Sequence, residues 1–321
     1  MRLVFLGTPA FAVPTLEAIV RAGHEVAAVL TQPDRPRGRG QNAAASPVKQ
    51  AALGLGLTIY QPERVRRPEA VEYLRGIACD AMVVVGYGQI IPRVVIDLAP
   101  LGIINVHASL LPKYRGAGPI QWAIVRGETR TGVTTMRIDA GLDTGDMLLK
   151  AETEIGRDEN AVELGRRLAV MGAGLLVETL EGLLGGKIVA EKQDDTQATL
   201  APLLKKEDGA IDWTQPAQAI HNRVRGLQPW PGAQTSFRGA PLHVWKTKSP
   251  TRGSGAVQGD RPTAGKLPGQ FVSLKPPVVA CGDGSLELLE VQLEGRQRIS
   301  AADFANGQRL TDNDILGEPR I

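Results

Sequence analysis

Two polar residues, Asn105 and His107, follow an apolar run that begins at Leu101 and predicts a buried strand. Side chains on a strand alternate between its two faces, so Asn105 and His107 are expected to point the same way, opposite to Ile104 and Val106. Open α/β sheets bind their ligands at the carboxyl ends of the strands. We therefore expect a functional site where this strand ends.

A carboxylate, Asp143, comes later in the segment Asp139–Asp146, which is rich in glycine and aspartate. An amide, an imidazole and a carboxylate together suit acyl transfer. The amide donates to an oxyanion, the imidazole carries a proton, and the carboxylate orients the imidazole and favours its charged form.

The elements that must position these groups follow a βαβ rhythm, in which short runs of Val, Ile and Leu alternate with helix-permissive segments. This rhythm predicts a mostly parallel sheet. The predicted strands are Arg2–Gly7, Glu25–Thr31, Ala81–Val85 and Ile103–Val106, and the predicted helices include Pro14–Ala22 and Ser46–Leu55. The two later strands Thr131–Asp139 and Met147–Ile155 flank the Asp143 turn. A long helix is predicted over Asp158–Leu184, with Asp158 as its N-cap and Gly185–Gly186 ending it.

Past the polar segment Glu191–Thr199, the pattern changes to short strands with many glycines and prolines, which predicts a small barrel or sandwich. These strands are Gln234–Phe237, Leu242–Lys246, Val278–Ala280 and Leu286–Val291, and residues 249–269 are expected to form a long loop. At 321 residues, the chain is long enough for one large α/β domain and a smaller one. We expect a catalytic domain over 1–190, a linker over 191–204 and a second domain over 205–321.

Basic residues are concentrated late in the chain. Residues 223–275 hold nine Lys and Arg and a single acid, Asp260, and aromatic residues lie among the cations. This composition fits a surface that follows a nucleic-acid backbone, and it equally fits a solvated positive face. The earlier segment Arg35–Gly40 carries three arginines and suits either an arm that closes on phosphate or a solvated loop.

Several other classes of protein are disfavoured. No run reaches the roughly eighteen apolar residues that a membrane span requires, and the start of the chain does not fit a signal peptide. The two cysteines, Cys79 and Cys281, have no Cys or His neighbour at metal-ligand spacing. The glycine fingerprint of a dinucleotide site is absent after Gly7. The expectation is a cytoplasmic protein without a membrane segment, disulfide, metal or nicotinamide cofactor.

The chain resembles the methionyl-tRNA formyltransferases, a branch of the folate-dependent formyltransferases. The resemblance runs in order over nearly the whole length, with 249–269 as the main unmatched stretch. It is carried by the segments 7–9, 31–36, 46–49, 105–112, 141–146, 211–213 and 229–232. Asn-x-His, Ser-Leu-Leu-Pro and the later Asp are shared by the wider class, whereas Thr31–Arg35 and the basic second domain point to the tRNA enzymes.

The resemblance implies a Rossmann-like catalytic domain followed by a small OB-fold-like β-barrel. It implies transfer of the formyl group of 10-formyltetrahydrofolate to the α-amino group of methionyl initiator tRNA, by a protein that we expect to be monomeric. Asn105, His107 and Asp143 then take the catalytic positions. The folate site that the resemblance implies comprises Ser109, Leu110, Leu111 and Pro112. From their place after the Ala81–Val85 strand, Gly86 and Tyr87 fit equally an ordinary turn and the wall of this pocket, and we include them in the expected folate site.

The expected tRNA contacts are Arg35, Arg37, Arg39, Arg223, Arg225, Lys246 and Lys248. Arg39 falls on the arginine of the family's mobile tRNA-contacting loop. Lysines often follow that loop in the family, but here Gln41–Ala45 follows it, which shifts the expected grip onto Arg35 and Arg37 or weakens it.

Two alternatives stay open from the sequence. The same chemistry serves a different acceptor in related enzymes, namely an amino sugar, glycinamide ribonucleotide, or water in a formyl-folate hydrolase. A non-catalytic RNA-binding protein on the same scaffold is the other alternative, although the intact Asn105, His107 and Asp143 speak against it.

Overall fold

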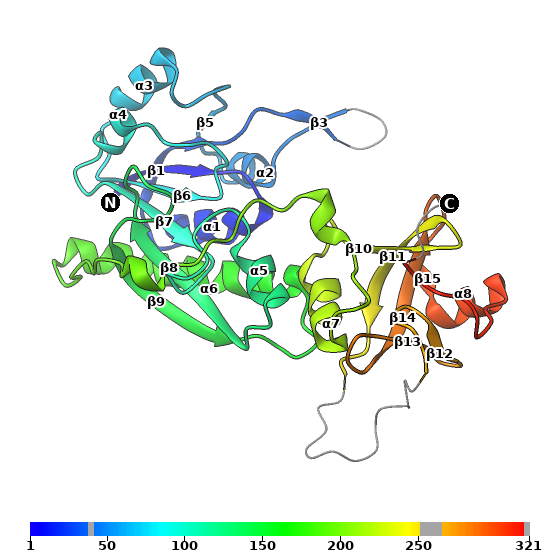
Figure 1. Cartoon of the computed structure of the whole chain (residues 1–321). Helices are drawn as coiled ribbons and strands as arrows, with labels where there is room; N and C mark the ends of the chain where they lie inside the picture. The colour runs from blue at the N-terminus through cyan, green and yellow to red at the C-terminus, as the bar shows by residue number, and fades with distance from the viewer. Residues whose placement is uncertain (38–41, 251–264, 318–321) are drawn as a thin grey trace. The chain divides into compact units, whose positions relative to one another are not determined.

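The computed structural model describes residues 1–37, 42–250 and 265–317 of the chain. These residues form two compact units, each with its own sheet (Figure 1). Unit 1 comprises Met1–Pro119, Thr131–Thr153 and Gly165–Pro202, and unit 2 comprises Ile120–Arg130, Glu154–Leu164 and Leu203–Ile321.

The sheet of unit 1 has seven strands in the order β5-β2-β1-β6-β7-β8-β9. Their bounds are β1 Arg2–Gly7, β2 Glu25–Leu30, β5 Ile59–Tyr60, β6 Ala81–Val85, β7 Ile103–His107, β8 Arg130–Arg137 and β9 Met147–Glu154. All pairings from β5 through β7 are parallel, and β8 runs antiparallel to β7. The prediction of a Rossmann-like, mostly parallel sheet is thus confirmed.

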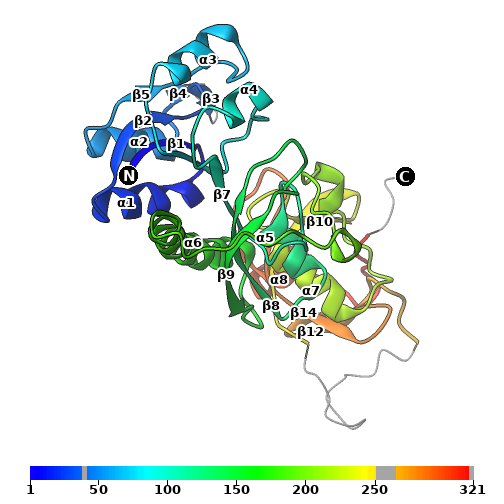
Figure 2. The ribbon, with the colours of Figure 1, turned by 90° about the vertical axis from the view of Figure 1, so that its left-hand side faces the viewer.

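Helices cover both faces of this sheet: Figure 2 shows α3 and α4 on one face and α1 and α6 on the other. The helices of the unit are α1 Val13–Arg21, α2 Pro47–Gly54, α3 Pro68–Arg75, α4 Arg93–Ile96 and α6 Ala161–Leu184, the last starting in unit 2. Leu74 of α3 and Ile96 of α4 pack in one cluster with Met82 of β6. On the opposite face, Gly172 of α6 lies so close to Val106 that a Cβ atom would meet its methyl group at 2.7 Å.

The predicted cap of the long helix is wrong by two residues, because Asn160 and not Asp158 caps it, and the helix starts at Ala161. Asn160 Oδ1 accepts the backbone N–H groups of Val162 and Glu163 at 2.9 and 3.0 Å. In return, the Glu163 carboxylate accepts the N–H of Asn160 at 3.0 Å. This reciprocal pair is a capping box, and it leaves the predicted cap, Asp158, outside the helix. The predicted end at Leu184, before Gly185, is confirmed.

Unit 2 is built on a six-stranded antiparallel sheet, which confirms the expected second β domain. The strands are β10 Ala233–Phe237, β11 Ala240–Thr247, β12 Phe271–Leu274, β13 Pro277–Ala280, β14 Ser285–Leu293 and β15 Ile299–Ser300. The edges of the sheet are β10 and β12, and residues 315–316 bridge both, through Phe237 and Gln270. This bridging closes the sheet in the manner of a small barrel.

Helices α5 Pro119–Val125, α7 Ala217–Gly226 and α8 Ala301–Gln308 complete unit 2. The core lies between α7, α8 and the sheet, where Ile220, Val224 and Phe304 pack with Val244 of β11 and Leu288 of β14. In the part of the chain that the structure describes, no helix combines the length and the apolar character needed to cross a bilayer.

Residues 191–202, which belong to the linker expected over 191–204, pair with strand β9 and with a loop of unit 1. Glu191 forms an antiparallel bridge with Met147, and Leu200 forms a parallel bridge with Arg115. Short strands of the hairpin β3 Arg35–Arg37 and β4 Asn42–Ala44 form a separate two-stranded sheet. The expected loop over 249–269 lies mainly outside the described residues.

Candidate functional site

The structure places Asn105 and His107 on one strand, β7, which lies between parallel β6 and antiparallel β8. Ile103 shares their face of the strand and packs in the cluster of α3 and α4. His107 is the last residue of the strand, so its ring is at the carboxyl edge of the parallel part of the sheet. This is the edge at which a ligand site was expected.

The Asn105 side chain is buried, with 9% of its surface exposed. Among the described residues, its amide forms no hydrogen bond with a protein group, whereas buried polar groups normally have a partner. An amide held in this state has donors free for a bound carbonyl oxygen.

The imidazole of His107 lies between two acceptors. Nε2 donates to the backbone carbonyl of Tyr114 at 2.9 Å, which fixes the plane of the ring. Nδ1 lies 3.6 Å from Oδ2 of Asp143, longer than a hydrogen bond. A neutral ring therefore carries its proton on Nε2 and presents a bare Nδ1, while a protonated ring presents an N–H from Nδ1 beside a carboxylate.

Both residues that contact the His107 ring have left-handed backbone conformations. Tyr114 has φ +63° and Asp143 has φ +52°. This region disfavours residues with a side chain, by about 1–2 kcal/mol, although Asp tolerates it through local hydrogen bonds. Oδ2 of Asp143 accepts the N–H of Gly116 at 2.8 Å, so the turn after Tyr114 also holds the carboxylate. Strained residues of this kind concentrate at functional sites.

The predicted folate residues Ser109–Pro112 form the loop that leaves β7. Ser109 Oγ donates to the carbonyl of Lys113 at 2.6 Å, and the Ser109 carbonyl accepts from Thr134 Oγ1 at 2.7 Å. Leu111 is buried with Met136 and Met147. These contacts fix the loop next to the His107 ring.

Gly86 and Tyr87 lie at the end of β6, beside β7. The Tyr87 side chain is 1% exposed and packs in the core cluster, and burial raises the pKa of its phenol. Its backbone carbonyl accepts hydrogen bonds from Thr8 and Gln32, both at 3.1 Å. Tyr87 thus supports the loops at this edge through its backbone carbonyl.

The predicted tRNA contacts are dispersed. Arg35 and Arg37 lie on the hairpin strand β3, where Arg35 is exposed, and Arg39 lies outside the described residues. Arg223 of α7 is half-buried and donates to the carbonyl of Asp208.

Arg225 is buried, with 8% of its surface exposed. Its guanidinium donates to the carbonyls of Gly156 and Glu159 at 3.1 and 2.8 Å, and to Asn222 Oδ1 at 3.1 Å. These bonds occupy its donors within unit 2, so Arg225 fits a structural role better than a phosphate contact.

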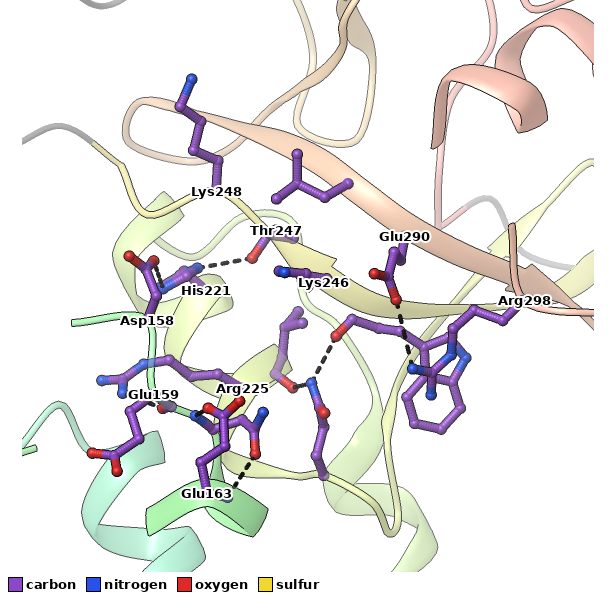
Figure 3. Close-up of a pocket in the computed structure, with 15 residues that line it drawn as sticks. Asp158, Glu159, Glu163, His221, Arg225, Lys246, Thr247, Lys248, Glu290 and Arg298 are labelled. Carbon is purple, nitrogen blue, oxygen red and sulfur yellow. Dashed lines mark hydrogen bonds and ion pairs between the residues drawn. The ribbon is translucent and has the colours of Figure 1, made fainter. Parts of the chain in front are cut away.

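Lys246 on β11 and Lys248, just after this strand, are exposed and line a cavity of about 670 Å³ within unit 2 (Figure 3). Besides Arg225, the charged lining consists of Asp158, Glu159, Glu163, Lys246, Lys248, Glu290 and Arg298. Lys248 pairs with Glu287 at 3.3 Å, and Arg298 with Glu290 at 3.6 Å. Carboxylates thus offset the cations locally, a feature that the charge count along the sequence did not reveal.

Sequence reasoning missed three residues that position the site: Tyr114, Arg115 and Gln193. Tyr114 supplies a carbonyl, so its side chain gives no signal. Gln193 donates hydrogen bonds to the carbonyls of Asp143 and Gly145, and Arg115 donates to Gln193. Both residues lie far from Asp143 in the sequence. The Arg-Gly step after the folate loop was the only local hint, and it becomes meaningful only with its distant partner in place.

Comparison with known proteins identifies the class to which this fold belongs. A family model described as "Formyl transferase" matches residues 1–180, and one described as "Formyl transferase, C-terminal domain" matches residues 203–309. The first match covers more than half of the chain, and the chain therefore belongs to the formyl transferase family.

Among its relatives, the chain is similar to the methionyl-tRNA formyltransferase of Solibacter usitatus (strain Ellin6076), with 77% identity over 321 residues and 100% of both chains covered. That of Koribacter versatilis (strain Ellin345) is 55% identical, with 99% of each chain covered. The structure of HypX from Aquifex aeolicus in complex with tetrahydrofolic acid shares the fold at a TM-score of 0.63 and 15% identity, over 95% of this chain and 47% of HypX.

Proposed function

We propose that the protein transfers the formyl group of 10-formyltetrahydrofolate to the α-amino group of methionyl initiator tRNA, as a monomer in the cytoplasm. The observation that carries the proposal is the arrangement at the end of β7. There the free amide of Asn105 lies near a His107 ring whose Nδ1 faces Asp143 at 3.6 Å. The family match supports the chemistry, and the methionyl-tRNA formyltransferase at 77% identity supports the acceptor.

In this proposal, attack of the substrate amine on the formyl carbon places negative charge on oxygen and positive charge on nitrogen. The Asn105 amide donates to the developing oxyanion. Because Nε2 of His107 is bonded to the Tyr114 carbonyl, Nδ1 is the ring atom that receives the amine proton. The Asp143 carboxylate then stabilises the charged ring. As the bond to the folate nitrogen breaks, that nitrogen takes up a proton.

The fit of the donor rests on the chemistry of the loops. A carbonyl oxygen matches the partner-free amide of Asn105, and the ordered Ser109–Pro112 loop offers backbone groups beside it. The acceptor is a polyanion, for which the exposed cations Arg35, Lys246 and Lys248 are suitable contacts, along with Arg37, Arg39 and Arg223. Arg225 contributes by holding α7 in place.

The test is an assay of the purified protein with 10-formyltetrahydrofolate and charged initiator tRNA. Parallel reactions contain free methionine, an amino sugar nucleotide, or water alone. We expect formyl-methionyl-tRNA as the product, with free methionine inert. Formylation of the sugar, or release of formate without tRNA, indicates one of the alternative acceptors. Absence of any turnover, with RNA binding retained, indicates a binding protein.

A further inference from the structure

The side-chain amide of Gln193 is held between the Asp143 turn and a buried arginine. Its Nε2 group donates to the backbone carbonyls of Asp143 and Gly145, both at 2.8 Å. Its Oε1 atom accepts from Nε and Nη2 of Arg115, at 3.0 and 2.8 Å. One side chain thus connects two loops that lie far apart in the sequence.

Arg115 is itself fixed. Only 6% of its surface is exposed, and Nη2 also donates to Asp195 at 2.7 Å. Its backbone N–H and carbonyl pair with Thr199 and Ala201 at 2.8 and 2.7 Å. The next residue, Gly116, supplies the N–H that binds the Asp143 carboxylate. Gln193 thus binds the backbone of Asp143 directly, and Arg115 holds the side chain of Asp143 through its neighbour Gly116.

The chemistry at position 193 requires an amide. A glutamine amide has two N–H donors and an oxygen with two lone pairs, and all four are used here. A carboxylate of the same shape keeps the bonds from Arg115. It has no proton for the two carbonyls and repels them, because all of these oxygens carry negative partial or full charge.

We propose that Gln193 and Arg115 are positioning residues that hold Asp143 in its left-handed conformation against His107, and that they set turnover through Asp143 without touching substrate. The inference deepens the proposed function and rests on it for the identity of the reaction. Among the described residues, the carbonyls of Asp143 and Gly145 have no other hydrogen-bond donor than Gln193. The further bonds of the turn run through side chains: Thr144 Oγ1 donates to the Asp139 carboxylate at 2.7 Å, and the Asp143 carboxylate accepts from Gly116. Release of the clamp therefore frees Asp143 from its place beside the ring.

The first test is Gln193→Glu in the full-length protein. A displacement of about 1 Å in a catalytic group costs up to about a hundredfold, so we expect kcat to fall by at least about tenfold, while the KM values for folate and tRNA stay within about threefold. Gln197→Glu is the matched control, since Gln197 is exposed on the same segment and its side chain forms a single hydrogen bond among the described residues, to Asp194 at 2.8 Å. It introduces the same charge and should leave kcat unchanged.

A double substitution tests the route of the effect. In an Asp143→Ala background, Gln193→Glu should change the residual rate by less than about twofold, because the group that it positions is already absent. The proposal would be overturned by a normal kcat in Gln193→Glu or by an effect of this variant on KM alone. It would also be overturned if the decreases in kcat caused by Gln193→Glu and Asp143→Ala were fully additive. Near-normal turnover in Asp143→Ala would also overturn it.

Amide hydrogen exchange tests the clamp without any assay of activity. Peptides covering 139–147 and 112–118 should exchange faster in Gln193→Glu than in wild type and in Gln197→Glu. Unchanged exchange sinks the clamp whatever the reaction is. Faster exchange in a protein that does not formylate methionyl-tRNA keeps the clamp and rejects the proposed function.

Discussion

Asn105 and His107 differ in how much of their hydrogen-bonding capacity the protein itself uses. The Asn105 amide is unbonded among the described residues, whereas Nε2 of His107 is committed to the Tyr114 carbonyl. The free groups of the site are therefore the amide of Asn105 and Nδ1 of His107. Both belong to side chains that leave one face of β7, so a single reacting carbon can be served by both.

We expect Asn105→Ala, His107→Ala and Asp143→Ala each to lower turnover by at least about a hundredfold, because each removes a group that stabilises charge in the transition state. Folate affinity should stay within a few-fold, since the Ser109–Pro112 loop is held by other bonds. Single-turnover rates and equilibrium folate titration measure the two quantities.

Asn306→Ala on α8 serves as the control for these variants, because Asn306 is exposed and lies in unit 2. It should retain wild-type turnover. A folded variant of Asn105, His107 or Asp143 with near-normal turnover would remove that residue from the mechanism.

The shared face of Asn105 and His107 was predictable, because alternation along a strand is a local property. The clamp around Asp143 was not. Gln193 acts on Asp143 across fifty positions of sequence and on Arg115 across 78. Nothing in the local pattern distinguishes it from the exposed Gln197, and both lie in a polar stretch that resembles a linker.

Helix α7 shows the same limit at the scale of elements. Its basic residues suggest a solvated positive face, yet Arg225 is buried. Its burial is possible because the carbonyls of residues 156 and 159 accept hydrogen bonds from its guanidinium. His221, one turn earlier, is 2% exposed and bonds Thr247 of β11 through Nδ1 at 2.8 Å. Apart from Asn222 on α7 itself, the hydrogen-bond partners named here for both side chains come from distant segments, so composition alone misassigns them.

Burial lowers the pKa of His221 below its ordinary value of 6.5, and the nearby charge of Arg225 lowers it further. The unfolded chain therefore binds a proton on His221 at a pH where the folded protein does not. Stability from this group is complete above the unfolded pKa and is lost as the pH falls below it. The free energy of unfolding should decrease between about pH 7 and about pH 5.5.

His221→Gln should make this decrease shallower, because its share of the proton uptake is removed. His24 and His243, whose pKa values burial also lowers, keep the remaining slope. Urea unfolding of both proteins at the two pH values measures the difference. Equal slopes would show that His221 does not contribute.

Element boundaries were predicted well where the signal is local. The strands that were predicted in unit 1 and in the barrel lie within a few residues of their predicted bounds, whereas the short strands β5, β12 and β15 were not predicted. Ser46, predicted as the first residue of a helix, is the cap of α2 and accepts the N–H of Lys49 at 3.0 Å. Asp158 and Asn160 are both good capping residues. Only the reciprocal bond with Glu163 decides for Asn160, and Asp158 lies instead 3.5 Å from Nε2 of His221.

At the scale of the whole molecule, the basic residues of the later part of the sequence differ in how accessible they are to a ligand. Arg225 is buried, and Lys248, although exposed, is paired with Glu287, whereas Lys246 is exposed on β11. Binding of a polyanion should therefore depend on a few exposed lysines and arginines.

If methionyl-tRNA is the acceptor, the logarithm of its affinity should fall linearly with the logarithm of salt concentration, by about 0.7–0.9 per phosphate contact. Lys246→Gln combined with Lys248→Gln should make the slope shallower by the amount that corresponds to about one or two phosphate contacts. The measurement is KM for methionyl-tRNA between about 50 and about 300 mM salt.

Lys150→Gln combined with Lys187→Gln is the matched control, because both lysines lie in unit 1 and are exposed. It should leave the slope as in wild type. A flat line for the wild-type protein would point to a small-molecule acceptor.

The division of the chain into two units has a consequence for its synthesis. The polypeptide passes from one unit to the other at residues 119–120, 130–131, 153–154, 164–165 and 202–203. Helix α5 and the stretch before α6 are made early, but their partners in unit 2, such as Gly226 beside Ile124, are made much later. On the ribosome, these segments wait for the last third of the chain, with apolar surface uncovered. In a fragment that ends at residue 202, the apolar surface of these segments would stay exposed. We therefore expect such a fragment to aggregate even though its sheet is intact.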